Sequence, residues 1–133
     1  MLWVAKYMGL VVLSNKVMSM FFGSDFLKDP ARKTKRKIWK DHFLANDRSG
    51  ILKVIKGVLT RKSITKNLPL INQPCLIMVG EKDTLTDYSK AEIMHKNIKD
   101  SILTVIPRAA HMTPVEEPEL VNSAIQDFLI NLK

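Results

Sequence analysis

The stretch Pro-Cys-Leu-Ile-Met-Val-Gly-Glu-Lys-Asp at residues 74–83 decides the fold of this protein. Residues 75–80 form a continuous apolar run of strand length that ends in a glycine, and no polar residue alternates within it. Such a run is typical of a strand that is buried on both faces, as in a parallel sheet. The sequence therefore predicts a buried strand here, with Glu81, Lys82 and Asp83 following its carboxyl end.

The residues that follow complete a strand–helix–strand–helix pattern. Residues 89–99 predict a helix with Asp87 or Ser89 as its cap. Residues 102–107 predict a second buried strand, and Pro118 opens a last helix whose apolar residues recur at i, i+3 and i+4. A crossover of this kind joins two neighbouring parallel strands. The predicted fold class is therefore α/β.

The first half of the chain has the pattern of short helices with an apolar inner side and a basic outer side. Residues 1–20, 31–45 and 51–59 each predict a helix. Residues 1–67 hold 15 basic and four acidic residues, whereas residues 68–133 hold six basic and nine acidic residues. Short helices bury little on their own, so we predict that the first segment lies on the β-α-β-α unit of the second.

Composition excludes several classes of protein and of site. The 133 residues suffice for one ordinary domain, and the single cysteine, Cys75, excludes a disulfide framework and a cysteine-rich zinc site. Lys6 and Lys16 interrupt the N-terminal apolar stretch before it reaches the about 18 residues of a membrane span. The basic residues 32–40 lie in no nucleic-acid motif and predict a solvated face. We expect a cytoplasmic protein with no metal, no membrane span and no nucleic-acid partner.

Two chemically useful side chains follow the two predicted strands. In open α/β sheets, functional residues collect beyond the carboxyl ends of the strands. Asp83 comes after the first strand and His111 after the second, so we expect them to meet at one edge of the sheet. Together they have the chemistry of the orienting acid and the base of a nucleophilic triad. From the residues alone, the alternative is a turn-forming aspartate and a structural histidine.

These two segments resemble the α/β-hydrolase family. Residues 74–83 resemble the strand and acid turn of that family, and Ala-His-Met-Thr-Pro-Val-Glu-Glu-Pro-Glu at residues 110–119 resembles its histidine loop. The order of aspartate before histidine also agrees with the family. The resemblance is specific over residues 69–133. Over residues 1–67 it is looser, and that segment would correspond to the helical cap of the family.

The resemblance implies roles for individual residues. Asp83 would be the triad acid and His111 the triad base, in the serine-dependent hydrolysis of a carboxylic ester or a related acyl bond. That reaction needs no cofactor or metal, and the apolar, Met-rich cap segment suggests a small hydrophobic substrate. Ala110 stands where the family usually has glycine, which predicts a slightly strained or shifted turn.

The sequence departs from the family in one further respect. It contains no Gly-x-Ser-x-Gly elbow for the nucleophile, and residues 23–25 (Gly-Ser-Asp) lack both the second glycine and a preceding strand. We therefore expect the C-terminal part of a hydrolase of about twice this length, with an incomplete sheet and little turnover alone. An open strand edge invites pairing, so we expect a homo-oligomer or a separate N-terminal half as partner. The alternative function is a non-catalytic binding or oligomerisation module that uses this edge and the basic helix.

Overall fold

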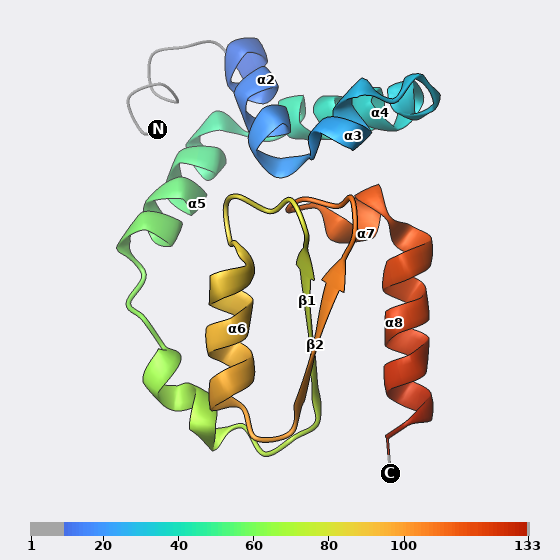
Figure 1. Cartoon of the computed structure of the whole chain (residues 1–133). Helices are drawn as coiled ribbons and strands as arrows, with labels where there is room; N and C mark the ends of the chain where they lie inside the picture. The colour runs from blue at the N-terminus through green and yellow to red at the C-terminus, as the bar shows by residue number, and fades with distance from the viewer. Residues whose placement is uncertain (1–9, 133) are drawn as a thin grey trace.

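The computed structural model describes residues 10–132, which form helices around a small parallel sheet (Figure 1). The elements follow the chain in the order α2 (Leu10–Phe21), α3 (Ser24–Lys28), the 3-10 helix η1 (Pro30–Arg32), α4 (Lys33–Leu44), α5 (Arg48–Thr60), the 3-10 helix η2 (Thr65–Leu70), β1 (Cys75–Gly80), α6 (Tyr88–Asn97), β2 (Ser101–Ile106), α7 (Thr113–Glu116) and α8 (Pro118–Ile130). Helices α2 to α4 lie beyond the carboxyl ends of the strands, and α5 runs down one side to η2 (Figure 1).

The sheet confirms the predicted α/β class. Strands β1 and β2 are parallel neighbours, paired in register from Cys75 with Ser101 to Gly80 with Ile106. Helix α6 connects them and covers one face of the sheet, while α8 covers the other (Figure 1). The first strand has the predicted bounds, because its apolar run is ended by a glycine and a polar turn.

Two apolar clusters form the core on the two faces of the sheet. On the α6 face, Ile77 and Val79 of β1 pack with Ala91 and Ile98. The members of the cluster on the α8 face are Ile106, Ala109 and Val121, with Met78 and Leu120 packed against them. Successive side chains of β1 belong to opposite clusters, with Ile77 and Val79 on one face and Met78 on the other, as the two-residue period of a strand requires.

The expectation that the second strand is buried is wrong in part. Ile102 and Val105 of β2 are exposed. Helix α8 covers the sheet near its first turns, through Leu120 and Val121, but Ile125 and Leu129 further along it are exposed. The predicted apolar face of the last helix is therefore only partly used within the described residues.

The helical first half agrees with the predicted pattern where the structure describes it. The helix predicted over residues 1–20 is present from Leu10, and residues 1–9 lie outside the described part of the chain. The helix predicted over residues 31–45 is divided into η1 and α4. The third helix begins earlier than predicted, at Arg48, because the Asp47 side chain caps it by accepting the Gly50 N–H.

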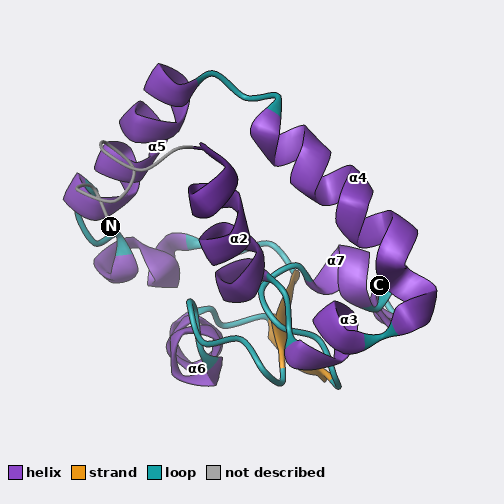
Figure 2. Ribbon diagram, turned by 90° about the horizontal axis from the view of Figure 1, so that it is seen from above, coloured by secondary structure: helices purple, strands orange, loops and turns teal. Residues whose placement is uncertain are grey.

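The helices of the first half differ in how they are packed. Met18 of α2, Phe22 just after that helix and Phe26 of α3 form a buried cluster against Trp39 of α4. On α5, by contrast, the apolar side chains Val54, Val58 and Leu59 are exposed. Figure 2 shows α2 and α3 above the strand ends, with α4 and α5 around them. Across residues 10–132, no helix is long and apolar enough to cross a membrane.

Candidate active site

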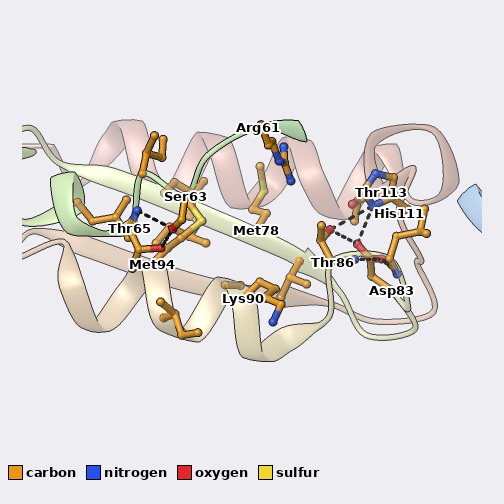
Figure 3. A pocket seen from close by; sticks show the side chains of 18 of the residues that line it. Arg61, Ser63, Thr65, Met78, Asp83, Thr86, Lys90, Met94, His111 and Thr113 are labelled. Atoms are coloured by element: carbon orange, nitrogen blue, oxygen red, sulfur yellow. Dashed lines mark hydrogen bonds and ion pairs between the residues drawn. The ribbon is translucent and has the colours of Figure 1, made fainter. Parts of the chain in front are cut away.

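Asp83 and His111 meet beyond the carboxyl ends of the two strands (Figure 3). Asp83 lies in the turn after β1, and His111 lies in the loop between β2 and α7. The His111 Nδ1 atom is 2.9 Å from Asp83 Oδ2. The predicted meeting of these side chains is therefore confirmed, because the parallel strands carry both to the same edge.

The turn after β1 surrounds the Asp83 carboxylate with hydrogen-bond donors. Its Oδ1 accepts the backbone N–H groups of Leu85 at 2.8 Å and Thr86 at 3.0 Å. Its Oδ2 accepts the Thr86 hydroxyl at 2.9 Å. Burial would raise the pKa of Asp83, but hydrogen bonds from Thr86, His111 and Leu85 outweigh it and hold the pKa below its ordinary value. The side chain is an ionised acceptor at neutral pH.

The His111 ring has one nitrogen occupied and one available. An ionised carboxylate only accepts hydrogen bonds, so the Nδ1 that faces Asp83 carries the proton. Within residues 10–132, Nε2 has no hydrogen-bond partner. The Phe21 ring meets the imidazole edge to face, with centroids 5.1 Å apart. This tautomer leaves Nε2 able to accept a proton.

The turn that delivers His111 is predicted to be strained or shifted because Ala110 stands in place of a glycine. Ala110 has no positive φ, and the left-handed residue is Arg108, with φ 63°. The Arg108 N–H donates to Glu81 Oε2 at 2.9 Å, which ties the turn to the end of β1. Strain expected at Ala110 is thus found two residues earlier, where the chain leaves β2.

Gly80 lets this turn approach β1 closely. A Cβ at Gly80 would lie 2.2 Å from the Ala110 carbonyl oxygen and 2.5 Å from that of Ala109. Both are backbone atoms, so the turn would have to move to accommodate a side chain. The glycine that ends the first strand therefore also sets the position of the histidine loop.

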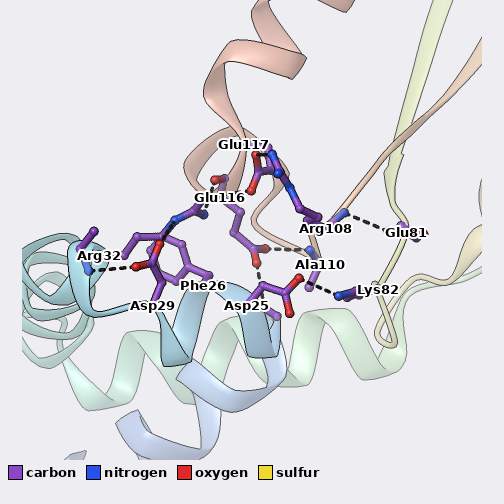
Figure 4. A network of polar contacts seen from close by, with 12 residues as sticks. Asp25, Phe26, Asp29, Arg32, Glu81, Lys82, Arg108, Ala110, Glu116 and Glu117 are labelled. Carbon is purple, nitrogen blue, oxygen red and sulfur yellow. Dashed lines mark hydrogen bonds and ion pairs between the residues drawn. The ribbon is translucent and has the colours of Figure 1, made fainter.

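Acidic residues after His111 join the loop to the helical first half (Figure 4). Glu117 accepts hydrogen bonds from Arg32 at 3.0 Å and from Arg108 at 2.8 Å. Burial would raise the pKa of Glu117, but these two guanidinium groups outweigh it and lower the pKa. A second link joins Lys82 Nζ to Asp25 at 2.7 Å. Sequence reasoning missed these links, because its only signal was acidic residues at the start of a helix.

An open groove of about 1040 Å³ runs along β1 and ends at the candidate site (Figure 3). Leu76 to Val79 of β1 form its floor, and residues 61–65 and helix α6 form its sides. Asp83, Thr86 and His111 lie at one end of the groove. Among the described residues, β1 pairs only with β2, so its other edge is open. Residues 10–132 contain no group of three His, Cys, Asp or Glu side chains that could hold a metal ion.

Curated proteins with similar sequences include several hydrolases and a synthase. The chain is 35% identical over 75 residues to the proline iminopeptidase of Saccharolobus solfataricus, a match that covers 56% of this chain and 24% of that protein. It is 32% identical over 73 residues to mouse monoacylglycerol lipase ABHD6, a match that covers 55% of this chain and 22% of that protein. It is 36% identical over 62 residues to human serine hydrolase BPHL, covering 47% and 21%. No protein-family model matches the chain.

Solved structures resemble almost the whole chain. A thermophilic esterase from Thermogutta terrifontis superposes with a TM-score of 0.83 and 23% identity over 97% of this chain and 47% of the esterase. The enol-lactonase from Burkholderia xenovorans LB400 superposes with a TM-score of 0.87 and 18% identity, covering 98% and 48%. The matches span less than a quarter of the three curated relatives above and about half of these two solved structures.

Proposed function

The chain is a C-terminal part of the α/β-hydrolase fold, and from that premise we propose that Asp83 and His111 are the acid and base of a serine hydrolase for carboxylic esters or related acyl bonds. The observation that carries the proposal is the 2.9 Å hydrogen bond between His111 Nδ1 and Asp83 Oδ2. The esterase- and peptidase-like names of the relatives support the same class of reaction.

The mechanism assigns each side chain a step. His111 Nε2 accepts the proton of a serine hydroxyl as that oxygen attacks the acyl carbon, and it later returns the proton to the leaving group. Asp83 holds the imidazole in the Nδ1–H tautomer and stabilises the imidazolium through the 2.9 Å contact. Hydrolysis of the acyl-enzyme repeats the sequence with water. A small hydrophobic ester fits the lipase, esterase and lactonase names of the relatives and neighbours.

The nucleophile and the oxyanion donors come from a polypeptide segment other than these 133 residues, because no Gly-x-Ser-x-Gly elbow occurs among them. We propose that this partner segment adds a strand to the open edge of β1. The groove along that edge is flanked by the exposed side chains of Ile64, Ile93 and Met94. Because His111 lies at the end of the groove, a turn that follows the added strand would lie beside it.

Residues 1–67 act in this proposal as the cap over the site. Helices α2 and α3 lie beyond the strand ends (Figure 2), and Phe21 of α2 contacts the His111 ring. The buried cluster of Met18, Phe22 and Phe26 supports this cap from within, and the Phe21 ring beside His111 gives the site an apolar neighbour.

Hydrolysis of p-nitrophenyl acetate tests the acid–base pair in the chain as it stands. A positioned imidazole accelerates this reaction without an oxyanion hole. We expect His111→Ala and Asp83→Asn each to lower the rate roughly tenfold, less than the 10²–10⁴ of a general base in a complete site. The matched control is His95→Ala, because the Nδ1 of His95 contacts the Ser101 hydroxyl rather than a carboxylate. Unchanged rates in both site variants would refute the assignment and favour a non-catalytic binding module.

A fluorophosphonate probe tests the origin of the nucleophile. Such probes label only an activated serine, so the intact mass of the chain should not increase after incubation. A stoichiometric adduct that His111→Ala abolishes would show that a serine among these residues is the nucleophile, and it would overturn the proposed partner segment.

A further inference from the structure

We propose that Glu116 is a positioning residue that holds the His111 loop in the geometry in which its imidazole faces Asp83. This inference rests on the proposed function for its catalytic meaning. Its structural content concerns only contacts within the described residues, so it can be tested without turnover.

Glu116 binds the backbone on both sides of His111. Its Oε1 accepts the N–H of Ala110 at 3.0 Å and the N–H of Met112 at 3.2 Å. These amides belong to the residues immediately before and after the histidine. A single carboxylate oxygen therefore fixes the path of the chain through His111, which limits where its side chain can point.

The second oxygen of Glu116 binds the helical first half. Its Oε2 accepts the N–H of Gly23 at 2.8 Å, across 93 positions of sequence (Figure 4). Two residues before that glycine, the Phe21 carbonyl accepts the Met112 N–H at 3.0 Å. The same segment places the Phe21 ring against the imidazole. Glu116 thus holds together the loop that carries His111 and the segment that packs on its ring.

The carboxylate is built into the core rather than exposed to solvent. Glu116 is 2% exposed, so its three backbone donors replace the water that a charged carboxylate would otherwise bind. A Cβ at Gly23 would lie 3.2 Å from Glu116 Oε2, so a side chain there would press on this contact. The side-chain oxygens of Glu116 accept hydrogen bonds only from backbone N–H groups. A buried acid with such partners is suited to fixing the backbone geometry of the His111 loop.

Glu116→Gln tests the role with little change in side-chain volume. The amide retains one accepting oxygen, but its NH₂ group cannot accept the Gly23 N–H. We expect hydrogen exchange at the Gly23 amide to accelerate roughly tenfold or more. We also expect the His111 ring, observed by ¹⁵N–¹H correlation spectroscopy, to shift from the Nδ1–H tautomer toward Nε2–H. Glu119→Gln is the matched control, because Glu119 is an exposed acid one turn along in α8.

If Glu116 had only a structural role, Glu116→Gln would lower the free energy of unfolding and leave the His111 tautomer unchanged. An unaltered His111 tautomer in Glu116→Gln, together with faster exchange at Gly23, would overturn the proposal. Gly23→Ala is the second variant if Glu116→Gln does not fold, because it presses on the same contact from the other side, and the same tautomer shift is expected. The two proposals can fail separately. If Glu116→Gln shifts the His111 tautomer but ester hydrolysis by the wild-type chain does not depend on His111, the proposed function is refuted and the positioning role of Glu116 stands.

Discussion

The turn after β1 makes Asp83 an acceptor of four hydrogen bonds. Two come from backbone N–H groups, one from the Thr86 hydroxyl and one from the His111 ring. An isolated carboxylate in a partly buried turn would be costly to ionise. The local sequence Asp-Thr-Leu-Thr at residues 83–86 supplies three of the four donors itself, so the acid is ready to orient the histidine before any substrate arrives.

The lowered pKa of Asp83 predicts a pH-dependent contribution to stability. A carboxyl whose folded-state pKa is depressed stabilises the fold fully above its unfolded-state pKa of about 3.9, and this contribution is lost as pH falls through the folded-state pKa. Asp83→Asn should therefore unfold more easily than wild type by about 1–2 kcal/mol near pH 5, a gap that narrows toward about pH 2.5. Urea unfolding of both proteins at the two pH values measures it, and a gap that is independent of pH would contradict the assignment.

The residues of the site were predictable to different degrees. Asp83 and His111 were predictable because each lies in the turn or loop that follows an apolar strand, and parallel strands end at a common edge. Glu116 was not, because one of its partners, Gly23, lies 93 positions away and only tertiary packing brings it near. The left-handed Arg108 was missed for a similar reason, since its conformation is held by a hydrogen bond to Glu81 across the sheet edge.

Among the elements, those with a local signal were the most predictable. Strand β1 has its predicted bounds, and Asp87, one of the two caps predicted for α6, caps that helix by accepting the Ser89 N–H. Helix α5 was also predicted, but not that its apolar side chains Val54 and Val58 would be exposed. Periodicity determines which face of a helix is apolar, whereas what covers that face depends on other parts of the molecule.

Two glycines in different elements predict opposite effects of the same substitution. Gly80→Ala should destabilise the fold by about 2 kcal/mol or more, because its Cβ would meet backbone atoms of the histidine loop. Gly57→Ala, inside α5, meets nothing within 4 Å and should stabilise by about 0.5–1 kcal/mol through helix propensity. Thermal unfolding of the two variants measures both changes in stability. A neutral Gly80→Ala would mean that the loop does not lie against β1.

At the scale of the whole molecule, the basic first segment and the acidic second segment are joined by a few polar contacts, of which those of Glu116 and Glu117 are buried and that of Lys82 with Asp25 is exposed. Glu117 is 4% exposed and bonds Arg32 on one side and Arg108 on the other. The remaining excess of positive charge lies on exposed faces such as that of α4. Opposite net charges therefore contribute to stability mainly where side chains are desolvated, at the histidine loop.

Removing the charge of Glu117 should lower the free energy of unfolding more than removing a charge from an exposed surface pair. Glu117→Gln removes the carboxylate that Arg32 and Arg108 share and leaves Arg32 with its ion pair to Asp29, so we expect a loss of about 1–3 kcal/mol. Asp41→Asn removes an exposed i,i+4 partner of Lys37 and should change stability by about 0.5 kcal/mol or less. Urea unfolding in low salt compares them. Equal effects would mean that the Glu117 contacts are solvated and do not join the two segments.

The open edge of β1 predicts how the chain behaves without its partner segment. A strand with one unpaired edge beside exposed apolar side chains tends to pair with another chain. We expect sedimentation analysis to detect concentration-dependent self-association. Met94→Lys, in the groove, should weaken it at least tenfold, whereas Ile130→Lys, at the far end of α8, adds the same charge and should have little effect. If both variants weakened association equally, net charge rather than the groove would control it. A chain that stays monomeric at every concentration would show instead that the edge is protected, and the partner strand would then have to displace whatever protects it.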